Sequence, residues 1–121
     1  MKNSATNVAL LHMVLPDTLK VEIGRSDDGG LYAIVQNLPG CYTQAADFVE
    51  LIEMVNDAVF SYFEVPEPLR DKFGFYIPDE VKRRMEQDQM KNEAPMPAAR
   101  VEAVFKEIID GKNTIEFSKA L

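Results

Sequence analysis

The chain has 121 residues, of which 46% are hydrophobic and 27% are charged, enough for the core of one globular domain with or without a small appendage. A single cysteine excludes an intramolecular disulfide and predicts a cytoplasmic protein, and with only one histidine a compact zinc site would depend on carboxylates for its other ligands. The net charge of −7 is uneven, because residues 1–80 hold 5 Lys/Arg against 13 Asp/Glu whereas residues 81–121 hold 8 against 7. An acidic half of this kind repels phosphate backbones and favours basic proteins as partners.

The first apolar segment, Asn7 to Leu15, is expected to be a buried strand. His12 interrupts it and Pro16 follows it, so the run is too short for a membrane span and lacks the cleavage site of a signal peptide. We therefore expect no membrane partner, and we expect His12 to be a hydrogen-bonded core or edge residue.

A hairpin is predicted next. Residues Leu19 to Arg25 alternate between apolar and polar, as a half-buried strand does, and Ser26 to Gly30 are residues that tolerate positive φ. The chain should turn there and return as a second, more central strand, Leu31 to Val35. The apolar face of the first strand is Leu19, Val21 and Ile23.

A corner and a helix follow the hairpin. Pro39 fixes φ and lacks an N–H, while Gly40 suits the left-handed position of a type II turn before a short third strand, Cys41 to Gln44. Asp47 has Glu50 three residues later, the spacing of a capping box, and Pro66 and Pro68 end the helix near Glu64. The apolar face of this helix is Phe48, Leu51, Ile52, Val55, Val59, Tyr62 and Phe63.

The rest of the chain is expected to be mostly helical. Its elements in order are a strand at Phe73 to Ile77, a helix at Asp79 to Lys91 with Pro78 at its start, a linker at Asn92 to Pro97, a helix at Ala98 to Asp110 with Gly111 as C-cap, and a short strand at Thr114 to Phe117. An exposed edge on the strand at Phe73 to Ile77 would favour pairing between two chains. The sequence therefore predicts an α+β fold, a small antiparallel sheet packed against one main helix, with residues 1–78 as an α/β domain and residues 79–121 as a helical C-terminal extension.

No pattern in the sequence predicts a catalytic site. The carboxylates of the acidic half lie in a turn, at a helix cap or on a solvent face, so a cluster that binds divalent metal is not expected. Cys41 has no histidine or basic residue near it in sequence and is expected to be a packed side chain. The glycines at 29 and 30 lack the spacing of a phosphate loop. We expect no enzyme activity, no metal and no cofactor.

Residues 18–64 resemble the HicB family of toxin–antitoxin antitoxins in the order strand, Asp-Gly turn, strand, Pro-Gly-Cys-x-Thr-Gln corner and helix. One departure is Ala45-Ala46-Asp47, where the family has Gly-Asp-Thr. The resemblance implies a partly RNase H-like α/β sandwich that neutralises a short, basic, RNA-cleaving toxin (HicA-like) by covering its catalytic face. The residues that match the family are Gly30, Tyr32, Pro39, Gly40, Cys41, Thr43, Gln44, Asp47, Glu50 and Ala58.

Three functions follow from the charge and from this resemblance. The first is an antitoxin that binds its basic toxin through acidic residues, for which the candidates are Asp27, Asp28, Glu53 and Asp57. The second is a HicB-like domain without a toxin that forms a homodimer or a higher homo-oligomer. The third is an autorepressor that binds DNA through Lys82, Arg83 and Arg84, in an extension that loosely resembles ribbon-helix-helix. DNA binding is less favoured, because the apolar strand at Phe73 to Ile77 has few side chains that read bases.

Overall fold

The computed structural model describes residues 8–92, 97–109 and 113–120. It is an α+β fold in which five antiparallel strands form one sheet in the order β3-β2-β1-β5-β4, so the predicted fold class is confirmed. The strands are β1 (Thr18–Arg25), β2 (Leu31–Val35), β3 (Tyr42–Ala45), β4 (Phe75–Pro78) and β5 (Thr114–Ala120). The helices are α1 (Val8–Val14), α2 (Phe48–Tyr62), α3 (Asp79–Asn92) and α4 (Ala98–Ile109), with a 3-10 helix, η2 (Glu67–Phe73).

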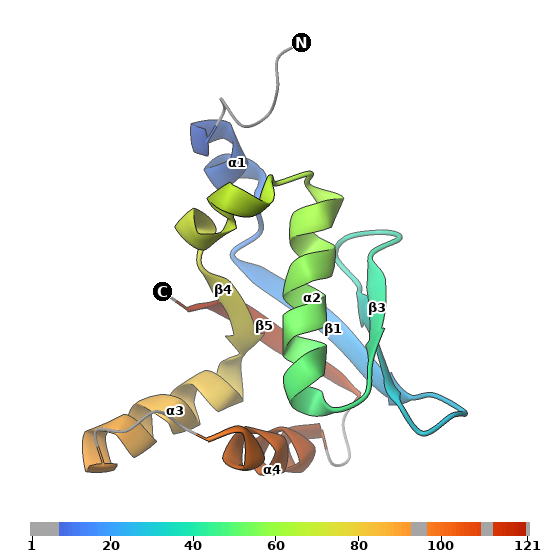
Figure 1. Ribbon diagram of the computed structural model, residues 1–121, viewed down its shortest axis with the longest axis vertical. Coiled ribbons are helices and arrows are strands. Elements are labelled where there is room, and N and C mark those ends of the chain that lie inside the picture. The colour runs from blue at the N-terminus through green and yellow to red at the C-terminus, as the bar shows by residue number, and fades with distance from the viewer. Residues whose placement is uncertain (1–7, 93–96, 110–112, 121) are drawn as a thin grey trace.

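Helix α2 lies across one face of the sheet, with α1 at one end of the molecule and α3 and α4 at the other (Figure 1). The core lies between α2 and the sheet. None of the helices in the described residues is long and apolar enough to cross a membrane.

The predicted hairpin is confirmed, because β1 and β2 pair through the turn at residues 26–30. The apolar face of β1 is almost wholly buried, with Leu19 and Val21 at 0% exposure and Ile23 at 3%. Gly29 has a φ of +92°, as the turn requires.

Helix α2 buries the predicted face only in part. Tyr62 is exposed and Phe63 is half-buried, whereas Asn56 and Phe60 are buried although neither was predicted. The helix ends at Tyr62, where the N–H of Val65 donates to the carbonyl of Phe60 and turns the chain toward η2. The buried face of α2 therefore includes Asn56 and Phe60 but not Tyr62.

The prediction of a strand at Asn7 to Leu15 is wrong, because the described part of this segment is the helix α1. Leu11 of α1 is buried, and so is Leu15 directly after the helix, whose N–H donates to the carbonyl of Leu11 at 2.9 Å. His12 is exposed and lies on the ring of Phe73, with the ring centroids 4.5 Å apart. It is therefore not a residue of a buried strand.

In the second half the predicted starts of both helices are confirmed, whereas the strand before them is displaced. Strand β4 begins at Phe75 because η2 continues to Phe73. Helix α3 begins at Asp79, directly after Pro78, and α4 runs from Ala98 to Ile109 with Val104 and Phe105 buried. Residues 93–96 of the predicted linker, Asp110 and the predicted C-cap Gly111 lie outside the described residues.

The final strand lies inside the sheet. β5 pairs with β1 on one side and with β4 on the other, and Phe117, at 0% exposure, is opposite both Leu19 and Pro78. The predicted strand at Thr114 to Phe117 is confirmed and continues to Ala120. Residues on both sides of the expected division at residue 78 therefore build one sheet.

A candidate protein-binding groove

The N-terminus of α2 has the predicted capping residues. Asp47 has extended backbone geometry, and its Oδ1 accepts a hydrogen bond from the N–H of Glu50 at 2.8 Å. Glu50 Oε1 in turn accepts from the N–H of Ala46 at 2.6 Å, one residue before the cap. Two carboxylates thus satisfy backbone donors at the positive end of the helix, where negative charge is stabilised.

A third carboxylate reaches the same helix end from α4. Glu102 Oε2 accepts from the N–H of Val49 at 2.6 Å, although 53 residues separate the two in sequence. The rings of Phe48 and Phe105 stack beneath this contact with centroids 4.7 Å apart. These contacts hold α4 beside the first turn of α2.

The hairpin turn contributes a fourth carboxylate. Asp28 Oδ1 accepts from the N–H of Gly30 at 3.1 Å. A Cβ on Gly30 would lie 3.1 Å from the carbonyl oxygen of Ala45, a tight contact that this carbonyl could accept only by shifting slightly. The match of Gly30 to the family pattern therefore has a structural reason.

These elements surround two hollows that share Ala46. One, of about 500 Å³, lies between the hairpin turn and the end of β3, and the other, of about 630 Å³, lies between α2 and α4. We call the two together the acidic groove. Its lining residues are Ser26, Asp28, Gly29, Gly30, Gln44, Ala45, Ala46, Asp47, Val49, Glu50, Glu53, Ala98, Ala99 and Glu102.

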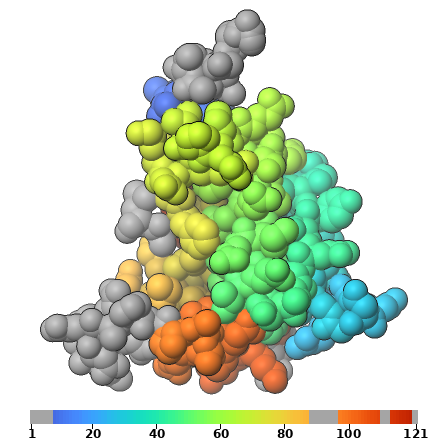
Figure 2. All heavy atoms as spheres, in the orientation of Figure 1, coloured from blue at the N-terminus to red at the C-terminus, as the bar shows by residue number. Residues whose placement is uncertain are grey.

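The residues that line the acidic groove carry a net negative charge. Five of its lining residues are carboxylates, and none of the described residues that line it is Lys, Arg or His. Figure 2 shows the elements that form it, with the hairpin projecting beside the first turns of α2 and with α4 next to them. The free lone pairs of these carboxylates suit the ammonium and guanidinium groups of a basic protein.

The four acidic residues predicted to contact a partner do not all lie in the groove. Asp28 and Glu53 line it, and Asp27 is exposed in the same hairpin turn. Asp57 lies further along α2 and pairs with Arg70, with Nη1 and Oδ1 2.9 Å apart. The structure thus brings together three of the four, counting Asp27 as a neighbour of the groove.

The corner residues that match the family set the backbone rather than a reactive site. The N–H of Cys41 donates to the carbonyl of Leu38 at 3.0 Å, and Gly40 has a φ of +85°, which together make the predicted turn. Cys41 is buried, and burial raises the pKa of its thiol. A buried neutral thiol is a poor nucleophile, which agrees with a packing role.

The remaining matched residues are spread over the sheet and α2. Tyr32 is directly opposite Gly24, and a Cβ on Gly24 would meet the Tyr32 hydroxyl at 2.3 Å, so the ring lies over the glycine. Ala58 packs against the core from α2. Pro39 is exposed at the corner, and Thr43 is half-buried in β3.

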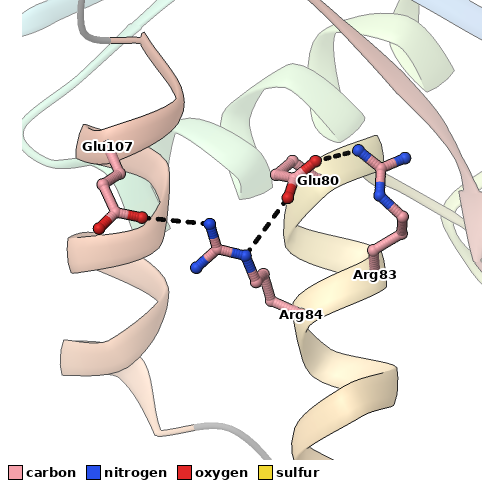
Figure 3. Close-up of polar contacts among 4 residues, drawn as sticks. All are labelled: Glu80, Arg83, Arg84 and Glu107. Atoms are coloured by element: carbon pink, nitrogen blue, oxygen red, sulfur yellow. Dashed lines mark hydrogen bonds and ion pairs between the residues drawn. The ribbon is translucent and has the colours of Figure 1, made fainter.

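The basic residues proposed for DNA contact all bond within the chain, and Figure 3 shows the contacts of Arg83 and Arg84. Arg83 and Arg84 both bond to Glu80, and these hydrogen bonds, that of Arg83 first, lower the pKa of the Glu80 carboxyl. Arg84 also reaches Glu107 of α4, with Nη2 and Oε1 3.2 Å apart. Lys82 Nζ donates to the carbonyl of Lys119 at 3.2 Å, so all three side chains join α3 to its surroundings or to itself.

The contribution of α4 to the groove was not predicted. Ala98, Ala99 and Glu102 have no local pattern that distinguishes them from any other exposed helix face, and only the position of α4 brings them to the start of α2. Within the described residues, no group of three or more His, Cys, Asp or Glu side chains is placed to hold a metal ion.

No family model and no solved structure matches this chain. A protein of Archaeoglobus fulgidus named "UPF0150 protein" is 39% identical over 51 residues, which are 42% of this chain and 74% of that protein. This identity over about three quarters of the relative shows that the chain belongs to the UPF0150 family.

Proposed function

We propose that this protein is an antitoxin-like binding protein that neutralises a small, basic, RNA-cleaving toxin by holding it against the acidic groove. It acts by binding and not by catalysis. The observation that carries the proposal is the groove itself, in which five carboxylates from three separate parts of the chain meet with no basic residue among the described lining. The resemblance of residues 18–64 to HicB antitoxins supports the identity of the partner.

The groove suits a basic protein better than a nucleic acid. Its carboxylates would repel phosphates, whereas they attract lysine and arginine side chains and speed the encounter with a basic partner. Each carboxylate that caps α2 or the hairpin turn is already held by a backbone N–H, so little side-chain entropy is lost when a cation binds. Glu53 has no such bond among the described residues and adds an adaptable contact.

The test uses a variant that removes charge from the groove without removing hydrogen-bond acceptors. Its substitutions are Asp28→Asn, Asp47→Asn, Glu50→Gln, Glu53→Gln and Glu102→Gln. Each amide oxygen can still accept from the backbone N–H, so the fold should be retained. The matched control removes the same charge from exposed or partly exposed acids elsewhere, by Glu64→Gln, Glu67→Gln, Asp71→Asn, Glu86→Gln and Glu116→Gln.

Tagged wild-type protein is used to capture partners from a lysate of its native host at moderate salt. We expect one short basic protein near a one-to-one ratio, and we expect that protein, once purified, to cleave RNA. Cleavage should stop on addition of wild-type or control protein and should continue with the groove variant. A captured protein without RNA-cleaving activity, or equal inhibition by both variants, would contradict the proposal.

A homo-oligomeric domain without a toxin is the alternative function. Recovery of the protein alone from the lysate, with no second chain, would favour this alternative.

A further inference from the structure

The two edges of the sheet differ. Strand β4 forms one edge, and the residue whose backbone faces away from β5 there is Tyr76. The buried side chain of Asn56 binds both the backbone N–H and the backbone carbonyl of Tyr76. The Tyr76 N–H donates to Asn56 Oδ1 at 2.6 Å, and Asn56 Nδ2 donates to the Tyr76 carbonyl at 2.7 Å. Pro78 follows with no N–H to offer. The edge at β4 is therefore closed to another strand.

Strand β3 forms the other edge and has no such cover. The N–H of Val35 donates to the carbonyl of Cys41, which makes these two a hydrogen-bonded pair. Because such pairs alternate along an antiparallel ladder, Thr43 also faces β2, and the N–H and C=O groups of Tyr42 and Gln44 face outward. Among the described residues, no side chain or turn bonds to these four groups as Asn56 does at β4.

The side chains beside this edge are apolar or neutral. Tyr42 is 69% exposed and Ile34 is 40% exposed, and both border a mainly apolar hollow of about 270 Å³. The four residues of β3, Tyr42 to Ala45, include no charged side chain. The chain has a net charge of −7, yet two copies that pair through β3 would place no acidic side chains of the two strands opposite each other.

We propose that two copies of this chain pair antiparallel through β3, on a two-fold axis at Thr43, to form one continuous sheet. This register places Tyr42 of each copy opposite Gln44 of the other, where the outward N–H and C=O groups of both residues can exchange hydrogen bonds. The Tyr42 side chains lie on the sheet face away from α2, where the partner copy covers part of their exposed rings. Gln44 and Ala45 also line the acidic groove, but β3 itself has no carboxylate, so its outward backbone groups suit the strand of a second copy better than the side chains of a basic protein.

The test is a charge exchange at the paired positions. One variant carries Tyr42→Lys and Gln44→Lys, and the other carries Tyr42→Glu and Gln44→Glu. In a homodimer of either variant, like charges face each other twice, whereas a mixed dimer has two Lys–Glu pairs. The control is Phe75→Lys, which adds a charge at the other edge, where Phe75 is 41% exposed.

Light scattering after gel filtration measures the mass, with circular dichroism to show that each variant is folded. We expect the wild type and the Phe75→Lys control to have twice the 13.6 kDa of one chain at high concentration, and each double variant alone to have 13.6 kDa. An equimolar mixture of the two double variants should return to twice that mass.

Three results would overturn the proposal: a wild-type chain that stays monomeric at every concentration, double variants that remain dimeric alone, or folded double variants whose mixture stays monomeric. The proposal does not depend on the acidic groove, because its measurement is the mass of this protein alone.

Discussion

Asn56 is the single polar residue of α2 that is buried, at 3% exposure. It lies at a helical position between apolar neighbours, and its amide bonds to Ile52 in its own helix and twice to Tyr76 in β4. Buried polar groups are stable only when they are hydrogen-bonded. Here the Asn56 amide and the Tyr76 backbone each provide the donor and the acceptor that the other needs. One side chain therefore both joins α2 to β4 and closes the edge of the sheet.

Substitution Asn56→Ala should lower the free energy of unfolding by about 3 kcal/mol, because it leaves the N–H and C=O of Tyr76 without their partners. Urea unfolding followed by circular dichroism measures the change. Glu53→Ala, on the exposed side of the same helix, is the control and should change stability by less than about 0.5 kcal/mol. Equal losses in both variants would show that the bonds to Tyr76 contribute little.

At the scale of elements, the start of α2 is unusual in taking a cap from another helix. Asp47 is the local cap, and Glu102 is a distant one that binds the N–H of Val49. Negative charge at a helix N-terminus is stabilising, and the effect is larger where the contact is partly buried, as it is for this bond. The contact joins α4, and with it one wall of the acidic groove, to the first turn of α2 beside the stacked rings of Phe48 and Phe105.

We expect Glu102→Ala to reduce the free energy of unfolding by about 1–2 kcal/mol, since the Val49 N–H loses its acceptor and the helix end loses a charge. Hydrogen exchange at Val49 should become faster than in the wild type. The control is Glu107→Ala in the same helix, whose exposed pair with Arg84 is worth less than about 0.5 kcal/mol. Unchanged exchange at Val49 in Glu102→Ala would argue against the distant cap.

At the scale of the whole molecule, strand β5 pairs with β1, the first strand in the sequence. β5 is bonded to β1 and β4, so β4 joins the sheet only through β5. The buried ring of Phe117 lies against Phe105, with centroids 6.2 Å apart, and links this strand to α4. Strand β5 therefore contributes to the core of the molecule.

Phe117→Ala should cost about 4 kcal/mol of stability, the usual effect of emptying an aromatic site in a core. Ser118→Ala, one residue on and facing the other side of β5, should cost less than about 0.5 kcal/mol. Thermal unfolding of the two variants measures the difference. A small effect of Phe117→Ala would indicate that burial of this ring contributes little to the stability of the core.

Sequence patterns predicted the parts of this protein whose signals are local. The hairpin, the corner at Pro39 and Gly40, and the cap at Asp47 follow from turn and cap preferences that act over a few residues, and all three are confirmed. The segment at Val8–Val14 was predicted wrongly, because a short apolar run suits a strand or a helix and only its packing decides between them. For the candidate site, the sequence identified Asp28 and Glu53 but not Glu102.

By itself the sequence determined the negative charge of residues 1–80, the α+β class and the order of elements in residues 18–62, although β3 runs from Tyr42 to Ala45 and not from Cys41 to Gln44. Only the tertiary structure decided that β5 lies between β1 and β4, that Asn56 closes one sheet edge, and that α4 completes the acidic groove. The physical reason is the range of the interactions. Turns and caps depend on neighbours along the chain, whereas strand order, a buried amide and a distant cap depend on which surfaces meet when the whole core forms.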